Sequence, residues 1–283
     1  MLHLKSDIKK MKNLIKKFLK KAKYSIVANT TLEFLKYDLI SALRNNFIGM
    51  TEFEKDILTK LIFNMSTDLK NTTNSRSQLG QDYLAQAAMG NALSGFFVEI
   101  GGGDPIIASN SYFLQESFKW RGIIVEPNPE LIKKTLEIRC QNEEVSVYPF
   151  ALSKNNGFEN FLPSGMLGTF ERYIDGDFHS DQRNKLKKSK GVIQVETKTP
   201  ATFIKDCDIS NIDFMSIDTE GSEWEIIANW PFDAIQPKVI CVEVNNRGFE
   251  LDILNFLEGK KYVNVLRRIS KYDLWFVLDS DSK

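Results

Sequence analysis

Residues 97–104 read "FVEIGGGD", an apolar run that passes directly into three glycines and a carboxylate. The apolar run has the length and composition of a buried β-strand. Glycine allows positive φ angles and carries no Cβ, so a ligand can lie against the main chain of the following turn. In an open α/β sheet, ligands bind beyond the carboxyl ends of the strands, next to the first such turn. The stretch therefore predicts a fold class and the position of a site.

From residue 78 onward, short apolar strands alternate with amphipathic helices. This alternation is typical of an α/β protein with a mostly parallel sheet and helices on both faces. We expect seven strands, at residues 96–101, 122–126, 145–149, 212–217, 238–244, 261–267 and 273–278. We expect helices at residues 79–89, 109–118, 129–139, 200–206, 222–228 and 249–258. Because the last two strands lie close together in sequence, they should form an antiparallel hairpin.

Two segments fall outside this pattern. Residues 1–76 are predicted to be a helical extension that precedes a domain at 77–283, and "NTTNSRS" at 71–77 marks the boundary. Residues 153–197 interrupt the alternation with glycines, aromatic residues and a basic run. An insertion this long in a compact α/β domain is typical of a lid or a binding element, and we expect it to bind the substrate.

The first 23 residues carry apolar side chains every third or fourth position and nine lysines elsewhere, which predicts a basic amphipathic helix at 1–23. Such a helix could rest on an anionic membrane surface, pair with a partner helix, or pack on its own domain with the lysines in solvent. We therefore expect a cytoplasmic protein for which peripheral contact with the inner membrane surface, or oligomerisation through this helix, stays open.

Charge and cysteine content exclude several classes of protein. Lys plus Arg and Asp plus Glu number 37 each, so a general nucleic-acid binder is not expected. Cys140, Cys207 and Cys241 lie far apart, which argues against a disulfide framework and a thiolate zinc site and favours a reducing compartment. No apolar stretch reaches the 18 residues of a spanning helix.

Two cofactor classes use a glycine turn of this kind. Dinucleotides require a third glycine three residues after Gly103, where this sequence has Ile106. Glu99 and Asp104 flank the turn, and their carboxylates would repel a pyrophosphate but suit a cation. S-adenosylmethionine carries positive charge on its sulfonium and its ammonium. The turn therefore favours S-adenosylmethionine, and NAD remains the alternative.

The next two strands add residues suited to an adenosine group. "RGIIVEPNP" at 121–129 places Glu126 at the strand end, where folds of this class bind ribose hydroxyls through a carboxylate. Pro127 belongs to the turn that faces the same crevice. The following strand leads to the small residues Ala151 and Ser153, which would leave room for an adenine ring.

Taken in order, seven stretches resemble the FkbM family of S-adenosylmethionine-dependent methyltransferases. They are "SQLGQDYLA" (77–85), "FFVEIGGGD" (96–104), "SNSYFLQ" (109–115), "WRGIIVEPNP" (120–129), "FALS" (150–153), "IDFMSIDTEGSEWEII" (212–227) and "VICVEVN" (239–245). The resemblance spans residues 77–278, and "IDTEGSEWE" is its most specific motif. It implies a class I methyltransferase (Rossmann-like) fold and, most often, O-methylation of a sugar hydroxyl in a glycan or natural product.

The resemblance also implies residue roles around the cofactor. The residues concerned are Gln78, Glu99, Gly101, Gly103, Ser109, Asn110, Glu126, Ala151, Ser153 and Asp218. Glu99 and the two glycines would surround the methionine end, and Asp218 would face the methyl group. Pro105 departs from the pattern, since many relatives have glycine there, and it stiffens the turn beyond Asp104.

Methyl transfer to a hydroxyl needs in-line positioning of the two reactants and a group that accepts the hydroxyl proton. Asp218 and Glu220, at the exit of a predicted strand, are the first candidates for this base. His179, in the insertion, is the other candidate, although a loop histidine is often a solvated surface group.

The acceptor is expected to contact Glu243 and Asn245, which end the following strand, and Arg183 in the basic run of the insertion. Arg183 would suit a phosphate, nucleotide diphosphate or carboxylate, but the run could equally be a solvated helix face. With Asp218 and Glu220, the strand-end residues offer only oxygen ligands, which hard cations accept. The same groups could hydrogen-bond sugar hydroxyls instead, and on this interpretation we assign no metal.

These observations predict an S-adenosylmethionine-dependent O-methyltransferase that acts on a hydroxyl of a sugar, a glycan or a related natural-product intermediate. The acceptor would be a small molecule or glycan, with or without a phosphate or nucleotide. Two alternatives remain, an NAD-dependent Rossmann-fold oxidoreductase and a non-catalytic glycan- or membrane-associated module on the same fold.

Overall fold

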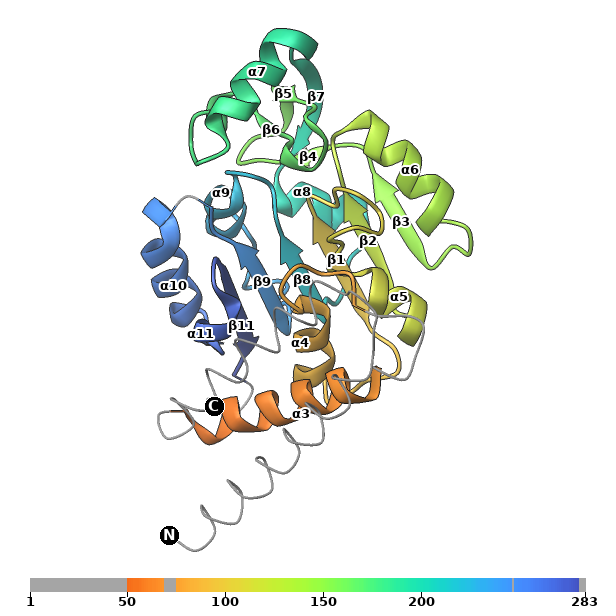
Figure 1. Cartoon of the computed structure of the whole chain (residues 1–283), viewed down its shortest axis with the longest axis vertical. Helices are drawn as coiled ribbons and strands as arrows, with labels where there is room; N and C mark the ends of the chain where they lie inside the picture. Colours follow the sequence, from red (N-terminus) through yellow and green to blue (C-terminus); the bar gives the residue numbers. More distant parts are fainter. Residues whose placement is uncertain (1–49, 69–74, 246, 280–283) are drawn as a thin grey trace, which may run out of the picture.

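The computed structural model describes residues 50–68, 75–245 and 247–279 (Figure 1). The predicted amphipathic helix at residues 1–23 lies outside these ranges. Within them, a seven-stranded sheet forms the centre of the molecule, and a smaller sheet lies at one end of it.

The large sheet contains all seven predicted strands. In spatial order they are β10 (Tyr262–Asn264), β11 (Asp273–Leu278), β9 (Val239–Glu243), β8 (Phe214–Ile217), β1 (Phe96–Ile100), β2 (Arg121–Val125) and β3 (Val145–Tyr148). The five strands from β9 to β3 are parallel, and β11 is antiparallel to both β9 and β10. The predicted α/β fold with a C-terminal antiparallel pair is therefore confirmed.

One predicted strand is shorter than expected. The strand predicted at 261–267 ends at Asn264, because Leu266 has a left-handed backbone with a φ of 54°. A short helix, α11 (Arg267–Ser270), follows and replaces the direct hairpin connection. The apolar pattern did not reveal this turn, because Val265 and Leu266 are buried although they no longer belong to the strand.

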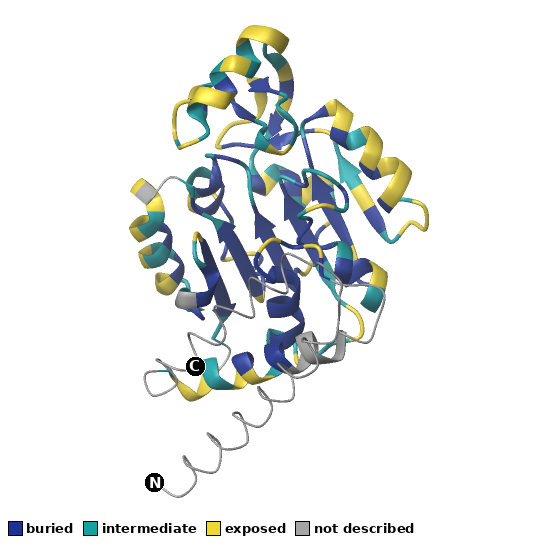
Figure 2. Ribbon diagram, in the orientation of Figure 1, coloured by how far each residue is buried: buried dark blue, intermediate teal, exposed yellow. Residues whose placement is uncertain are grey.

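Helices cover both faces of the large sheet, and each face has its own apolar core. These helices are α4 (Gln81–Ala88), α5 (Tyr112–Phe118), α6 (Pro129–Arg139), α8 (Pro200–Asp206), α9 (Glu223–Ala228) and α10 (Glu250–Gly259). Side chains of a strand alternate between faces, so Phe97 packs in the core with α4 and α5 while Val98 packs in the core with α9 and α10. Figure 2 shows the strands buried and the outer faces of α6 and α10 exposed.

The insertion is a second sheet rather than a loop. Its strands are β4 (Ala151–Leu152), β7 (Ile193–Lys198), β5 (Gly157–Leu162) and β6 (Thr169–Phe170), and α7 (Ser180–Lys190) connects β6 to β7. A small core holds these strands together, with Phe161, Phe170 and Val195 buried. In Figure 1 this lobe lies above the end of the large sheet at which the glycine turn emerges. Its strands escaped prediction because β4 and β6 have only two residues each, and at least half of the residues in β5 and β7 are polar or glycine.

Helix α3 (Glu52–Asp68) belongs to the same core as the domain that follows it. Ile57, Leu58, Leu61 and Ile62 are each at most 2 % exposed and pack in the cluster that contains Trp275 of β11. Their spacing places them on one face of the helix. The predicted division at residues 76 and 77 therefore does not separate two cores, because the end of the extension packs on the domain.

The cysteines and helices also bear on the expectations drawn from composition. Cys140, Cys207 and Cys241 are free thiols, as their spacing predicted. Across the described ranges, no helix is both long enough and apolar enough to cross a membrane.

Truncation of α3 at its buried face should destabilise the whole domain. Leu58→Ala should lower the free energy of unfolding by about 2–5 kcal/mol, because it leaves a cavity in the shared core. Phe53→Ala, on the exposed side of α3, should lower it by less than about 1 kcal/mol. Urea denaturation followed by circular dichroism measures both, and identical curves for Leu58→Ala and the wild type would place α3 outside the core.

Candidate active site

The glycine turn after β1 brings two main-chain segments into contact. Gly101 has a φ of 81°, and a Cβ at this position would lie 1.7 Å from the main-chain oxygen of Asp218. The N–H of Asp218 donates to the carbonyl of Ile100 at 2.9 Å, which holds the turns after β1 and β8 together. Glycine at 101 is therefore required by backbone packing as well as by any ligand.

Glu126, at the end of β2, closes the other side of this turn. Its carboxylate accepts hydrogen bonds from the N–H of Gly103 at 2.9 Å and from the N–H of Asn128 at 2.7 Å. Burial raises the pKa of Glu126 to about 7, and the negative charge of Glu99 adds to the rise. Glu126 therefore changes charge close to neutral pH.

Three cavities open at this end of the large sheet. The first, which we name the glycine cavity, has a volume of about 480 Å³ including its mouth. The predicted residues on its wall are Gly101, Gly103, Glu126, Pro127, Ala151, Asp218 and Glu220. The small sheet adds Phe161, Met166 and Phe170, which sequence analysis missed because nothing in the insertion marks them as facing the glycine turn.

The second cavity, the inner cavity, has a volume of about 240 Å³ and lies among the ends of β8, β9 and β11. It is lined by Gln78, Gln81, Ala108, Asn110, Ser216, Ile217, Asp218, Cys241, Glu243 and Asp273. Gln78 and Asn110 are among the residues that the family resemblance implied around the cofactor. Gln81 and Asp273 were not predicted, because they lie far apart in the chain and no sequence pattern marks them as parts of one site.

The third cavity, the outer cavity, is the largest at about 1320 Å³. Its lining is Gln78, Met166, Leu167, Gly176, Phe178, His179, Asp218, Glu220, Glu243, Val244, Asn245 and Tyr272. Asp218 lines all three cavities, so this residue lies where they meet. The structure thus brings together the predicted residues Asp218, Glu220, Glu243 and Asn245.

Three carboxyl groups cluster at this junction. The carboxylate oxygens of Asp218, Glu220 and Glu243 lie within 4.8 Å of one another. Burial and the mutual repulsion of these charges raise the pKa of Asp218 well above its usual value and that of Glu243 to about 8. Because Asp218 and Glu243 lie this close together, the pKa of each depends on the charge of the other.

Glu220 has fixed partners that Asp218 lacks. Its carboxylate accepts from Arg183 at 2.6 Å and from the Asn245 amide at 3.0 Å. Burial and the Asp218 charge raise its pKa, and Arg183 opposes the rise. Glu220 has a φ of 59°, and the turn around it is held by Glu223, which accepts from the N–H groups of Thr219 and Gly221.

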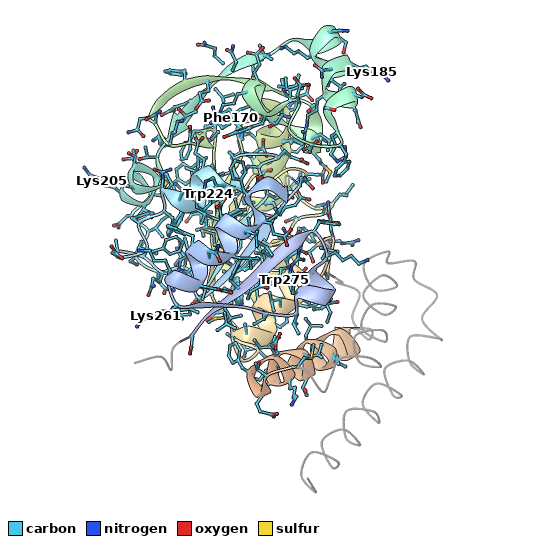
Figure 3. All side chains as sticks on the ribbon, turned by 90° about the vertical axis from the view of Figure 1, so that its left-hand side faces the viewer. Phe170, Lys185, Lys205, Trp224, Lys261 and Trp275 are labelled. Atoms are coloured by element: carbon cyan, nitrogen blue, oxygen red, sulfur yellow. The ribbon has the colours of Figure 1, made fainter. Side chains whose placement is uncertain are left out.

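The predicted contact between Arg183 and the acceptor is wrong. Arg183 is fully buried, and its guanidinium also donates to Asp177 at 2.7 Å and to the carbonyl of Leu167 at 3.2 Å. All its polar atoms are therefore used inside the protein. The solvated-face interpretation holds for Lys185, which projects outward from α7 (Figure 3).

Glu99 is also placed differently from the prediction. Its carboxylate accepts from Ser109 Oγ, from the N–H of Asn110 at 2.7 Å and from Ser111 Oγ, and Arg139 interacts with it electrostatically. Glu99 and Ser109 line none of the three cavities. Glu99 therefore orders the loop that carries Asn110, and its contact with the cofactor is not supported because it lies outside all three cavities.

Two more predicted residues have clear positions. Ser153 is buried, and its hydroxyl donates to Glu159 and Glu225 at 2.7 and 2.8 Å, so it does not line the glycine cavity as predicted. His179 is half-buried on the wall of the outer cavity beside Phe178. His179 is thus placed to reach a molecule in the outer cavity.

The comparison with protein families decides what this site belongs to. The Methyltransferase FkbM domain matches residues 99–264, from the glycine turn to β10, and includes the small sheet. The chain belongs to the FkbM family of methyltransferases. With the seven-stranded sheet, the FkbM match confirms the class I methyltransferase fold and sets aside the NAD-dependent oxidoreductase.

Several solved structures resemble the chain at low sequence identity. The chain is similar to a precorrin-6y C5,15-methyltransferase from Geobacter metallireducens GS-15, with 15 % identity over 64 % of this chain and 70 % of that one, and a TM-score of 0.36. It is similar to the METTL16 MTase domain, with 11 % identity over 87 % of this chain and 90 % of that one, and a TM-score of 0.40. It is also similar to CalO1, a methyltransferase in calicheamicin biosynthesis, with 10 % identity over 89 % of this chain and 70 % of that one, and a TM-score of 0.31. No curated protein matches the sequence.

Removal of Arg183 should destabilise the FkbM domain rather than alter acceptor binding alone. Arg183→Met leaves Asp177 and Glu220 buried without their cation, so the free energy of unfolding should fall by about 3–5 kcal/mol. Lys185→Met, on the same helix, should leave it within about 0.5 kcal/mol of the wild type. Urea denaturation compares them, and equal stability of the two variants would contradict the buried pairing.

Proposed function

We propose that the protein is an S-adenosylmethionine-dependent O-methyltransferase that acts on a hydroxyl of a sugar, a glycan or a related natural-product intermediate. The observation that supports this most directly is that the glycine cavity and the outer cavity meet at Asp218, with Met166 and Glu220 on both walls. A methyl donor in one cavity and an acceptor in the other would face each other across this junction, as in-line transfer requires.

The glycine cavity suits the adenosine part of the donor. Glu126 would accept hydrogen bonds from the ribose hydroxyls, and Ala151 with Phe161 would flank the adenine ring. The sulfonium would then lie close to Asp218, whose negative charge attracts it. This arrangement keeps the cofactor roles predicted for Gly101, Gly103, Glu126 and Asp218.

The outer cavity suits a hydroxyl-bearing acceptor without phosphate. Glu243 and Asn245 offer polar atoms to hydroxyl groups, while Phe178 and Tyr272 offer flat apolar faces to a sugar ring. Among the described residues that line this cavity, none is Lys or Arg, and Arg183 is engaged elsewhere. Of the two kinds of acceptor that the sequence left open, we therefore propose the one without phosphate.

Asp218 is the proposed base. A base of raised pKa accepts a proton more readily at neutral pH, and general base catalysis contributes about 10²–10⁴-fold to a rate. Glu220 is less suited because Arg183 and Asn245 hold its carboxylate. His179, which also lines the outer cavity, is the second candidate.

Cofactor affinity should depend on the charge of Glu126. Because its pKa is about 7 and the ribose hydroxyls need a charged acceptor, affinity for S-adenosylhomocysteine should fall about tenfold between pH 8 and pH 6. Glu126→Gln should bind about 10- to 100-fold more weakly at pH 8 and lose this part of the pH dependence. Calorimetry with Glu130→Gln, an exposed acid of α6, as control tests this, and absence of any wild-type binding would refute S-adenosylmethionine dependence.

Asp218→Asn should abolish transfer while the cofactor still binds. We expect turnover to fall at least about 100-fold, because the proton acceptor is lost. Release of S-adenosylhomocysteine is measured with a panel of sugars, sugar nucleotides and glycolipids, and Asp181→Asn on exposed α7 is the control. Wild-type turnover in Asp218→Asn would remove it from the mechanism, whereas cofactor binding with no transfer to any acceptor would favour the non-catalytic module.

A further inference from the structure

The inner cavity differs in kind from its two neighbours. Its volume of about 240 Å³ includes open solvent at the mouth, and the enclosed interior has room for about one water molecule. The interior is therefore too small for a cofactor or a sugar. Carboxyl groups of Asp218, Glu243 and Asp273 line it from β8, β9 and β11, and Asn110 lines it from the loop after β1. Four elements thus direct oxygen-bearing side chains at one small space.

Asn110 carries an oxygen atom with no partner. The residue is 6 % exposed, its main-chain N–H donates to Glu99 at 2.7 Å, and its side-chain Nδ2 donates to Ser216 Oγ at 2.8 Å. Its Oδ1 is buried without any hydrogen-bond donor. A buried acceptor left unpaired costs about 1–3 kcal/mol, so such an atom in an otherwise satisfied loop indicates a missing ligand. Because Ser216 also lines the inner cavity, the bond to it holds the amide at the cavity wall.

The charges around the cavity are not balanced. Asp218 and Glu243 have their oxygen atoms within 4.8 Å of each other, yet neither forms an ion pair with a described Lys or Arg. Arg183 is paired with Asp177 and Glu220. The donors that reach the Asp273 carboxylate are the neutral Gln81 amide and the Trp275 indole, while Arg267 donates to the Asp273 main-chain carbonyl at 3.4 Å and lowers the pKa of its carboxyl group through space. Among the described residues that line the cavity, none is cationic.

We propose that the inner cavity binds a divalent cation of the Mg²⁺ and Mn²⁺ type, held by Asp218, Glu243 and the Oδ1 atom of Asn110. Carboxylate and amide oxygens are the ligands that these hard cations prefer, and water completes their coordination. The cation would supply the positive charge that is missing beside Asp218 and Glu243. It would also give Asn110 Oδ1 the partner that this atom lacks. This proposal replaces the sequence-based expectation of no metal, in which the strand-end residues hydrogen-bond sugar hydroxyls instead.

The position of the cation suggests how it would act. Asp218 lines the inner cavity on one side and the junction of the two larger cavities on the other. A cation there could polarise a hydroxyl that enters from the outer cavity and lower the pKa of that hydroxyl. With Asp218 bound to the cation, His179, which lines the outer cavity, would accept the proton in its place. Cation binding itself does not depend on the proposed methyl transfer, so it can be tested without a known acceptor.

Titration of the full chain with Mn²⁺, followed by the electron paramagnetic resonance signal of the free ion, tests the proposal in the absence of cofactor. We expect one saturable site for which Mg²⁺ competes. Asn110→Ala and Glu243→Gln should each weaken Mn²⁺ binding at least tenfold, and Asn110→Asp should retain it. Glu258→Gln, an exposed acid of α10, should bind as the wild type does.

Three outcomes would overturn the proposal. One is the absence of saturable binding at millimolar Mn²⁺, and another is unchanged affinity in both Asn110→Ala and Glu243→Gln, which would place the ion elsewhere. The third is displacement of Mn²⁺ by S-adenosylhomocysteine in direct competition, which would assign the cavity to the ammonium group of the cofactor. Circular dichroism confirms that each variant is folded, and if one fails to fold the other decides.

Discussion

The site depends on the contact between the main chain at Gly101 and the main-chain oxygen of Asp218. A Cβ at position 101 would lie 1.7 Å from that oxygen, so only glycine allows the two turns to approach this closely. The contact aligns the ends of β1 and β8 and places the side chain of Asp218 at the junction of all three cavities. The glycine turn therefore does more than leave space for a ligand, because it also positions the acidic group opposite.

The small sheet completes the site through polar contacts with the turn after β8. Arg183 binds Glu220 at 2.6 Å, and the hydroxyl of Thr169 donates to the main-chain carbonyl of Glu220 at 2.7 Å. A second link joins Arg172 to Glu225 of α9 at 3.0 Å. Because Phe161 and Phe170 of this sheet face the glycine cavity, the same contacts fix both the cavity wall and the charge of the acidic cluster. We infer that the insertion is an integral wall of the site.

Sequence patterns identified strand-end residues well and the roles of basic and buried residues poorly. Glu126, Asp218 and Glu243 were found because the carboxyl ends of parallel strands meet at one edge of a sheet. Arg183 was misjudged because a basic run looks the same whether one guanidinium turns inward or all face solvent. Glu99 was misjudged because its partners are Ser111, in the loop before α5, and Arg139, at the end of α6. No rule of sequence spacing connects Glu99 to these two residues.

The sequence by itself determined the strands of the large sheet, the helices that alternate with them, their order and the family, because these follow from the periodicity of apolar residues and from contiguous motifs. Only the tertiary structure decided which polar groups are free to act. It paired Glu220 with Arg183, enclosed Glu99 in a hydrogen-bonded loop, and left Asn110 Oδ1 without a donor in the lining of a cavity that Asp218 and Glu243 also line. The physical reason is that desolvation and pairing depend on distances between residues far apart in the chain, to which local sequence patterns are insensitive.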